Sequence, residues 1–567
     1  MRRFRWGMIA VYALWLGSAF PARAALPSDD VVFRSMRDEM GRNMRRLRMD
    51  DLPGPYYLAY TVREGTQAFI TASFGALEGS QASSFLEARV QVRVGDDSFD
   101  NTNFVPAGFG SGGPGLGSAS FEDDYDNLRF SLWSLTDDTY KNALEAFAKK
   151  KAFRERHRIM ESPGDFSREQ PVERYEPSAW VPIDRGLWER RVRELSAVFR
   201  DYPDIQDSRV ELSFVSGTRR FISSEGSVVR GSDAQISIGV TANTQGKDGL
   251  RFGDSEGLHY PSWADVPAQG ALLAEVRRFA RGVVDVVHGS TVEAYVGPVI
   301  FEGEAAAEFF DVQLVDNISN PRGSWDEDEN SHVFDPPPFV SRLGMRVAVP
   351  WLSFVDDPLL ERYDGVPLFG HYMIDDEGVP AQRLELVRKG KLVGLYMSRA
   401  PIREFKHSNG HGRSAFVGEP SGRMGNLIVT PEKPVPLSEL KDRMRAMCRE
   451  LELDYGIVVR EMGGLTPVRA YKVYAADGRE EPLAGVEFVG AGFRPLRDIV
   501  AASKERYVFN FLHGSNGRTV VPASIVAPAI LVQEMELRKT ERKPERMPYL
   551  EHPYFVEKGR DQRIPVR

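Results

Sequence analysis

Two glutamates that could work as a pair, Glu304 and Glu308, lie four residues apart in the segment EGEAAAEFF (302–310). The segment is a predicted helix, and residues four apart share one helix face. The two carboxylates could therefore act as general acid and base, or bind a cation. Acidic side chains are also common near helix N-termini, because the helix dipole stabilises them there. The pair is a catalytic candidate with a plain structural alternative.

A second cluster, HSNGHGR (407–413), brings together His407, His411 and Arg413. Two histidines that bind one zinc ion commonly lie one turn apart on a helix, as in the motif H-E-x-x-H, which the sequence lacks. Asn409 and Gly410 favour a loop instead. Such a loop could place the imidazoles and the guanidinium in a substrate-binding cavity. In the alternative interpretation, the histidines hydrogen-bond the backbone of a turn.

A third motif, GDSEG (253–257), matches the nucleophile-elbow pattern G-x-S-x-G. An elbow requires a strand before the serine and a helix after it. The surrounding residues, 245–263, are polar and are predicted to form a loop. We therefore reject a serine nucleophile at Ser255.

The composition excludes several classes of protein. The chain has 567 residues, nine histidines, a single cysteine (Cys448) and a formal net charge of −8. One cysteine can form neither an internal disulfide scaffold nor a cysteine-rich zinc module. An acidic chain without a long run of lysine and arginine is also not a dedicated nucleic-acid-binding protein. Cys448 lies at core spacing from Leu440 and Met444 in a predicted helix, which favours a buried apolar role.

The N-terminus has the three parts of a secretory signal peptide. Arg2, Arg3 and Arg5 form a positive region, an apolar stretch follows over 6–20, and Ala22-Arg23-Ala24 supplies small residues at a cleavage site. An uncleaved membrane anchor is the alternative. Cleavage after Ala24 makes the mature chain more acidic, because it removes four arginines and no acid. We expect an exported, periplasmic protein.

Two segments at an offset of 152 residues repeat one pattern: GTQAFITASFGALEGS begins at Gly65, and GTRRFISSEGSVVRGS begins at Gly217. Each copy lies between stretches with the polar–apolar alternation of a β-strand. We interpret the repeat as a duplicated hairpin-plus-strand unit; the alternative is a chance match between two unrelated hairpins.

The helices and strands that must position these residues are predicted to form an α+β protein. We expect a duplicated β-hairpin/helix N-terminal half, followed by a large, mostly antiparallel β-rich C-terminal domain with a few helices. The predicted parts are a signal peptide (1–24), a first α/β domain with a Gly-rich insertion (106–120) and a linker (25–183), a second, repeat-like α/β domain (184–290), the C-terminal domain (291–545) and a tail (546–567).

Several motifs, in order and spacing, resemble the TldD/PmbA family. The resemblance covers about 180–540, with a weaker match over 30–100. The motifs are FISSEGSVVRGS (221–232), GPVIFEGEAAAEFF (297–310), DDEGVPAQRLELVRKGKLVGLYMSR (375–399), HSNGHGR (407–413), GNLIV (425–429) and GSNGRTVVPASIVAPAILVQEMEL (514–537).

The resemblance implies a pair of subunits. Members combine a TldD-type metallopeptidase with a PmbA-type (TldE) subunit that lacks the metal helix, and together they degrade peptides and unfolded chains. TldD-type chains bind zinc through two helix histidines and a downstream cysteine. In this sequence Gly303 and Glu308 occupy the histidine positions, Glu304 the general-base position and His513 the cysteine position. The chain thus resembles the non-metal subunit and is expected to bind no cofactor, with zinc in a TldD-type partner.

The expected function is that of an exported subunit of a peptide-processing complex. The expected partners are a TldD-type chain in a heterodimer, or a second copy in a homodimer, with a peptide or unfolded protein as substrate. No nucleic acid is expected to bind, and no membrane after signal cleavage. Two alternatives remain open. One is a metallopeptidase with a divergent site built on Glu304, Glu308 and His513, in which Glu308 and His513 are the candidate metal ligands. The other is a non-enzymatic, homodimeric peptide-binding protein.

Overall fold

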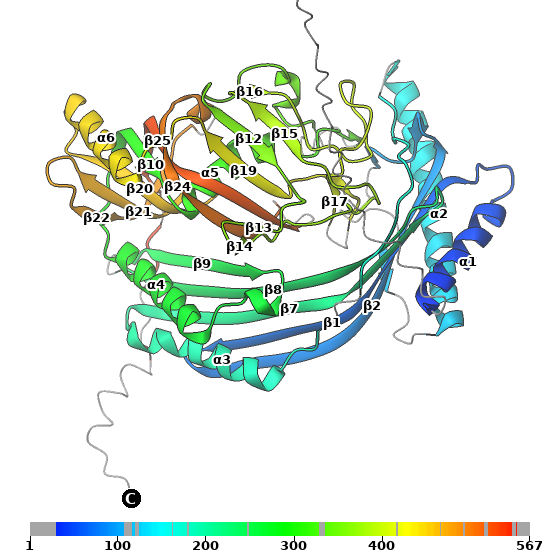
Figure 1. Cartoon of the computed structure of the whole chain (residues 1–567), viewed down its shortest axis with the longest axis horizontal. Coiled ribbons are helices and arrows are strands. Elements are labelled where there is room, and N and C mark those ends of the chain that lie inside the picture. Colours follow the sequence, from blue (N-terminus) through cyan, green and yellow to red (C-terminus); the bar gives the residue numbers. More distant parts are fainter. Residues whose placement is uncertain are drawn as a thin grey trace, which may run out of the picture.

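The computed structural model describes residues 30–106, 116–118, 124–160, 163–177, 181–246, 249–327, 335–414, 418–464, 466–490, 494–514, 520–541, 543–546 and 552. The predicted signal peptide, most of the Gly-rich insertion and most of the predicted tail lie outside these residues. Among the residues described, no helix is both long enough and apolar enough to cross a membrane. Large sheets and several helices confirm the predicted α+β class (Figure 1).

A strongly curved, eight-stranded sheet forms the N-terminal half (Figure 1). Its four long central strands are antiparallel neighbours in the order β2-β1-β7-β8, and β9 pairs with the outer edge of β8. The strands of this half are β1 (Pro55–Ser73), β2 (Ala76–Asp96), β3 (Phe99–Asp100), β4 (Phe104–Val105), β5 (Leu116–Ser118), β6 (Glu173–Tyr175), β7 (Ile205–Ser223), β8 (Val228–Gln245) and β9 (Arg251–Tyr260).

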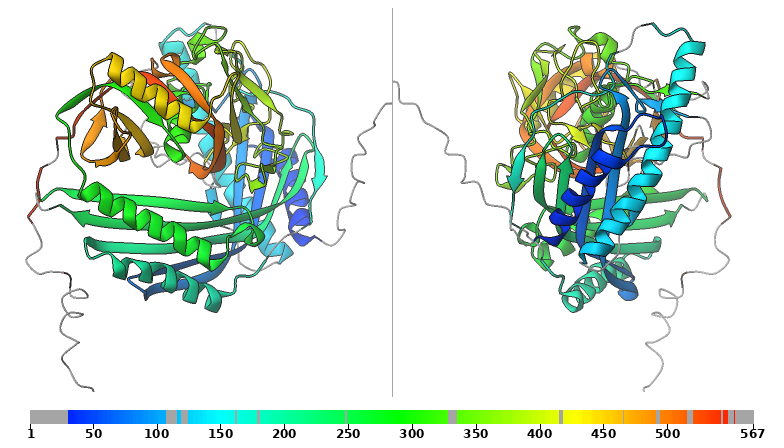
Figure 2. Two further views of the ribbon diagram at one scale, coloured as in Figure 1. Left: turned by 60° about the vertical axis from the view of Figure 1, so that its left-hand side comes forward. Right: turned by 90° about the vertical axis from the view of Figure 1, so that its right-hand side faces the viewer.

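Four helices cover the convex face of this sheet (Figures 1 and 2). The helices α1 (Val31–Arg46) and α2 (Tyr125–Arg156) lie at one end, and α3 (Arg185–Ala197) and α4 (Gln269–Val287) lie at the other. Side chains alternate between the faces of a strand, so the even-numbered apolar residues of β1 point toward the helices. Leu58 and Tyr60 join the core under α1 and α2, and Ile70 joins the core under α3 and α4.

The two repeated segments each form a hairpin, and the two hairpins lie side by side. The first copy forms the β1–β2 hairpin and the second forms the β7–β8 hairpin. The strands β1 and β7 then pair antiparallel, with Gly65 directly opposite Gly217. This confirms the duplicated unit. The two predicted α/β domains therefore contribute neighbouring hairpins to one sheet.

An eleven-stranded sheet forms the centre of the C-terminal half, in the order β16-β15-β12-β19-β25-β10-β20-β21-β22, with β23 and β24 also paired to β25. Only the β10–β20 and β19–β25 pairs of this described sheet are parallel, so the predicted mostly antiparallel arrangement is confirmed. Its strands are β10 (Ala294–Phe301), β12 (Leu352–Asp356), β15 (Leu384–Arg388), β16 (Lys391–Leu392), β19 (Asn426–Pro431), β20 (Tyr455–Gly463), β21 (Thr466–Tyr474), β22 (Glu480–Leu483), β23 (Val486–Phe488), β24 (Ile499–His513) and β25 (Val521–Lys539).

Two helices and several two-residue strands complete this half. The helix α6 (Leu437–Glu450) packs on β10 and β24 and buries Cys448, in line with its predicted apolar role. The short elements of this half are β11 (Trp325–Asp326), β13 (Arg362–Tyr363), β14 (Val366–Pro367), β17 (Gly412–Arg413), β18 (Ser421–Gly422) and the 3-10 turns η3 (Val315–Asn317), η5 (Val340–Arg342) and η6 (Pro495–Arg497). The 3-10 turns η1 (Val198–Asp201) and η2 (Trp263–Asp265) belong to the N-terminal half.

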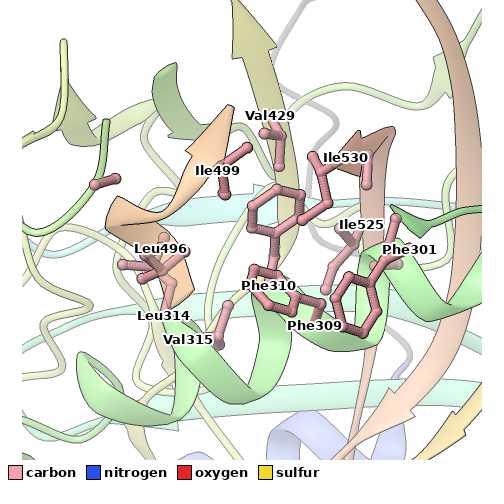
Figure 3. Packing of buried hydrophobic residues seen from close by; sticks show 14 of the residues in the cluster. Phe301, Phe309, Phe310, Leu314, Val315, Val429, Leu496, Ile499, Ile525 and Ile530 are labelled. Atoms are coloured by element: carbon pink, nitrogen blue, oxygen red, sulfur yellow. The ribbon is translucent and has the colours of Figure 1, made fainter. Parts of the chain in front are cut away.

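The helix α5 (Glu304–Gln313) is anchored in the main core of the C-terminal half (Figure 3). Phe309 and Phe310 are buried against the sheet, as is the run of three alanines at 305–307. Burial of this apolar face fixes the rotation of the helix about its axis. The opposite face, at positions 304, 308 and 311, carries three carboxylates in a row.

The C-terminal half lies on the concave side of the curved sheet (Figures 1 and 2). Arg399 joins the two halves: its Nε donates to the carbonyl oxygen of Ser167 at 2.9 Å, and its Nη1 donates to Glu225 at 2.7 Å. The Arg399 side chain is only 2% exposed. A buried charge with satisfied partners fixes the geometry of the surfaces it joins, so the clefts between the halves have well-defined walls.

Candidate functional site

A cleft of about 940 Å³ separates the edge of the curved sheet from the C-terminal sheet. One wall consists of α4 and the side chains of Glu256, Leu258 and Tyr260 on β9. The opposite wall contains the start of α5, with Gly303 and Glu304, together with residues of β20, β21, β24 and β25. The first of the two candidate glutamates therefore faces a cavity large enough for several peptide residues.

The carboxyls of the candidate pair, Glu304 and Glu308, are largely shielded from solvent. Burial, with the nearby carboxylate of Glu256 as a smaller contribution, raises the pKa of Glu304 to about 7. Burial and the charge of Glu304 raise the pKa of Glu308 to about 9. Glu308 accepts a hydrogen bond from the backbone N–H of Met462 at 2.7 Å. Carboxyls with pKa values near or above neutrality can act as proton donors and acceptors.

Charged residues from three elements surround Glu304. Arg469 on β21 forms an ion pair with Glu461 on β20, and its Nη2 lies 3.5 Å from Glu256 on β9. Arg278 on α4 forms a second ion pair with Glu256. Burial still raises the pKa of Glu256, so the two arginines offset only part of its desolvation. Arg469 thereby links the edge strand of the first sheet to the second sheet beside the cleft.

The edge strand β9 was not predicted. The sequence prediction placed residues 245–263 in a polar loop, and this is wrong, because residues 251–260 pair with β8 along their whole length. The alternation of Asp254, Glu256, Leu258 and Tyr260 along one face was the available sign of a strand, but Gly253 and Gly257 obscured it. The rejection of Ser255 as an elbow nucleophile is unaffected, since no helix follows the serine directly.

The residue that precedes α5, Gly303, has no side chain that could bind a metal ion. Gly303 precedes the helix in a left-handed conformation (φ 63°), and a Cβ built there would meet no atom within 4 Å. A side chain at this position would enter the cleft, but at this φ it would also strain the backbone. Gly303 and Glu308, whose carboxyl accepts the Met462 N–H, do not fit the zinc site that the family resemblance implies, because neither supplies the imidazole nitrogen that such a site has at its position.

His513 lies at the other end of the same helix. It ends β24, is 4% exposed, and faces Asp311 at the last turn of α5. Among the described residues, one group of three possible metal ligands has all its ligand atoms within 4.8 Å of one another: Asp311, Asp316 and His513. Of the predicted metal candidates, His513 belongs to this group and Glu308 does not.

The three candidates of the 407–413 segment have different surroundings. His411 is fully buried; its Nε2 lies 3.2 Å from Asp356, and its Nδ1 lies 3.0 Å from the carbonyl oxygen of Asn409. A ligand cannot reach it, so the contacts agree with the structural alternative. His407 is 74% exposed and lies 3.4 Å from Glu169. It does not line either of the two large clefts.

Arg413 lines a second cavity, of about 550 Å³, between the concave sheet face and the C-terminal half. Its Nη1 donates to the carbonyl oxygen of Pro522 at 2.6 Å, and its guanidinium lies over the ring of Tyr372. Asp375 is at the same cavity and accepts from the backbone N–H of Gly412 at 2.9 Å. The structure therefore brings Arg413 to a cavity wall, but not to the cleft that contains Glu304.

Comparison with known proteins gives matches of three kinds. Residues 294–539 match the family of PmbA/TldA metallopeptidase C-terminal domains. A metalloprotease of Archaeoglobus fulgidus is 34% identical over 88 residues, but the match covers only 16% of this chain and 19% of that protein. The chain thus spans about a fifth of the length of this relative. A metalloprotease TldD homolog of Haemophilus influenzae is 24% identical over 399 residues, covering 67% of this chain and 78% of that protein.

The fold also matches a solved structure. TldE from Thermococcus kodakarensis superposes with a TM-score of 0.57 at 15% identity, over 89% of this chain and 99% of that one. At this identity the match shows a shared fold, and chemistry must be argued from the residues at the site.

Proposed function

Because the chain belongs to the TldD/PmbA family, we propose that it is an exported subunit of a peptide-degrading complex in which a TldD-type partner carries the catalytic zinc. The chain itself would be catalytically silent. The family assignment supports a metallopeptidase-related role, and the lack of histidines at positions 303 and 308 supports the choice of subunit. Export rests on the signal-peptide pattern of residues 1–24.

The first turn of α5 is the observation that carries this proposal. Gly303 supplies no ligand, and the carboxyl of Glu308 is turned to the backbone N–H of Met462. Glu304 keeps the general-base position beside the cleft. Without imidazoles at positions 303 and 308, the start of α5 lacks the ligands that would hold a zinc-bound water beside Glu304, so the helix keeps the general base of a zinc peptidase but not its metal ligands.

The cleft supports a role in holding an extended peptide. Among the described strands, β9 pairs only with β8, and its side chains at Glu256, Leu258 and Tyr260 line the cleft. An extended peptide could add to this edge by backbone hydrogen bonds, which select for an unfolded conformation more than for sequence. We propose that the peptide substrate pairs with the free edge of β9.

Reconstitution tests the subunit assignment. The mature chain (25–567) is purified alone and is then mixed with a TldD-type chain of the same organism whose metal helix carries both histidines. We expect no cleavage of an unfolded protein by the mature chain alone, co-elution of the two chains, and chelator-sensitive cleavage by the mixture.

Two controls make the result decisive. Glu304→Gln in this chain should leave cleavage by the complex within about twofold, because the partner supplies the chemistry. Replacing a metal-helix histidine of the partner should abolish cleavage. The proposal would be overturned in favour of a divergent peptidase if this chain alone showed chelator-sensitive cleavage that is lost in Glu304→Gln. A stable homodimer that does not bind the TldD-type chain would favour a peptide-binding protein.

A further inference from the structure

Two carboxylates from α5 and the turn after it converge on one buried imidazole. The Nε2 atom of His513 lies 3.4 Å from Oδ1 of Asp311 and 3.8 Å from Oδ1 of Asp316. Asp311 belongs to the last turn of α5, Asp316 to η3, and His513 to the end of β24. The three residues belong to three different elements, and His513 is far from the two aspartates in sequence. The fold therefore brings their ligand atoms together.

The contacts are too long for a well-formed hydrogen-bonded ion pair. An N–H···O hydrogen bond usually spans about 2.7–3.2 Å, and both distances exceed that range. Oδ1 of Asp311, which faces Nε2 of His513, is buried and has no hydrogen-bond partner among the described residues. His513 is more than nine-tenths buried and points into the group. Unsatisfied buried polar atoms of this kind are costly, so they suggest a missing partner.

The geometry suits a metal ion as that partner. Zinc lies about 2.0–2.2 Å from imidazole nitrogen and carboxylate oxygen, so two ligands of one tetrahedral ion are about 3.4 Å apart. The distances between Nε2 and the two carboxylates have this size. The Asp316 side chain is 45% exposed, which leaves one side open for entry and for solvent ligands. Among the described residues, no lysine or arginine forms an ion pair with either carboxylate.

We propose that Asp311, Asp316 and His513 bind one divalent first-row transition-metal ion, Zn²⁺ or Mn²⁺. One imidazole and two carboxylates favour ions of intermediate softness over Mg²⁺, which prefers oxygen ligands alone. The ion would tie the C-terminal turn of α5 to the end of β24. Of the residues predicted as metal positions from the family resemblance, the site uses only His513, and it lies at the opposite end of the helix from Gly303. It departs from the expectation that this chain binds no metal.

Metal titration of the untagged mature chain tests the site directly. The protein is freed of metal with a chelator, dialysed, and titrated with Zn²⁺, Mn²⁺ or Mg²⁺ by calorimetry, with thermal unfolding as a second readout. We expect one equivalent of Zn²⁺ or Mn²⁺ to bind and to raise the unfolding temperature, and Mg²⁺ to bind more weakly by an order of magnitude or more. Co²⁺ substitution adds a spectroscopic readout, because the intensity of its visible bands reports coordination by protein ligands.

Variants locate the ion. Asp316→Asn and His513→Gln should each weaken binding on the order of 10-fold or more. Asp316 is half exposed, so Asp316→Asn gives a clear result even if His513→Gln fails to fold. His407→Ala removes an exposed histidine elsewhere and should leave the affinity unchanged.

Three results would overturn the site. One is the absence of stoichiometric Zn²⁺ or Mn²⁺ binding, which would leave an ordinary ion pair. Another is affinity that persists in both Asp316→Asn and His513→Gln. The third is equal loss in Glu308→Gln, which would move the ion to the first turns of α5. These outcomes are distinct from failure of the proposed function, which is read from cleavage by the chain alone.

Discussion

Gly65 and Gly217 lie directly opposite one another on β1 and β7, and each approaches the backbone of the other strand. A Cβ added to Gly65 would overlap the carbonyl oxygen of Ser216, and one added to Gly217 would overlap the carbonyl oxygen of Glu64. The first glycine of each sequence repeat is thus required because the backbone of the other copy lies too close to admit a side chain. The contact joins the two hairpins into one curved sheet, on which the cleft walls depend.

Gly65→Ala and Gly217→Ala should each destabilise the fold. The added methyl group meets backbone atoms, which cannot rotate away, so the strands must separate locally at a cost of about 1–3 kcal/mol. The measurement is the midpoint of thermal or urea unfolding. Gly270→Ala on α4 is the matched control, because a Cβ there meets nothing within 4 Å, and alanine in a helix should be neutral or stabilising by up to about 1 kcal/mol. Equal stability of all three variants would contradict the close contact.

The repeat and α5 could be predicted from sequence because the patterns that specify them lie within short stretches of the chain. The offset between Gly65 and Gly217 specifies two hairpins, and the spacing of Glu304 and Glu308 in an alanine-rich segment specifies a helix face. The strand β9 could not, because its glycines and acids have low strand propensity and only pairing with β8 makes it extended. The role of His411 was also undecidable, because its partner Asp356 lies 55 residues away.

Arg469→Gln should strongly destabilise the contact between β9 and the second sheet. The substitution removes the ion-pair partner of Glu461 and one of the two partners of Glu256, and it leaves buried carboxylates less compensated. Loss of one member of such a buried group costs about 3–5 kcal/mol. The defect should shrink as pH falls, because protonation removes the uncompensated charge. Unfolding measured at pH 7.5 and at pH 5 tests both statements.

The control for this variant is Arg494→Gln, whose side chain is 82% exposed and pairs with Asp498 at the surface. It should change stability by no more than about 0.5 kcal/mol at either pH. The double variant Arg469→Gln/Glu461→Gln should recover part of the loss, since it removes the carboxylate that the single variant leaves without its ion-pair partner. A double variant less stable than the single one would rule out the electrostatic explanation.

His411→Ala and His407→Ala should differ sharply in stability. His411 is fully buried with both ring nitrogens hydrogen-bonded, so its loss creates a cavity and removes one hydrogen-bond partner each from Asn409 and Asp356, at a cost of about 2–4 kcal/mol. His407 is 74% exposed, and its loss should cost no more than about 0.5 kcal/mol. Thermal unfolding of the two variants gives the comparison. If His407→Ala were as destabilised as His411→Ala, the assigned burial of the segment would be incorrect.

Glu308→Gln should flatten the dependence of stability on pH. The pKa of Glu308 is raised from 4.5 to about 9 in the folded chain, chiefly by burial. A raised pKa means that the folded state holds the proton more tightly than the unfolded state, so the associated stability is fully present below pH 4.5 and is lost as pH rises toward 9. Glutamine keeps an oxygen to accept the N–H of Met462 but cannot ionise. The stability of the variant should match that of the wild type near pH 4.5 and exceed it at pH 9 by an amount on the order of a few kcal/mol.

Urea unfolding across this pH range measures the difference in stability. The exposed Glu534→Gln is the control, and its stability should follow the wild type throughout. Parallel profiles for Glu308→Gln and the wild type would show that Glu308 ionises as freely as a surface glutamate, and would contradict its burial in a poorly solvated site.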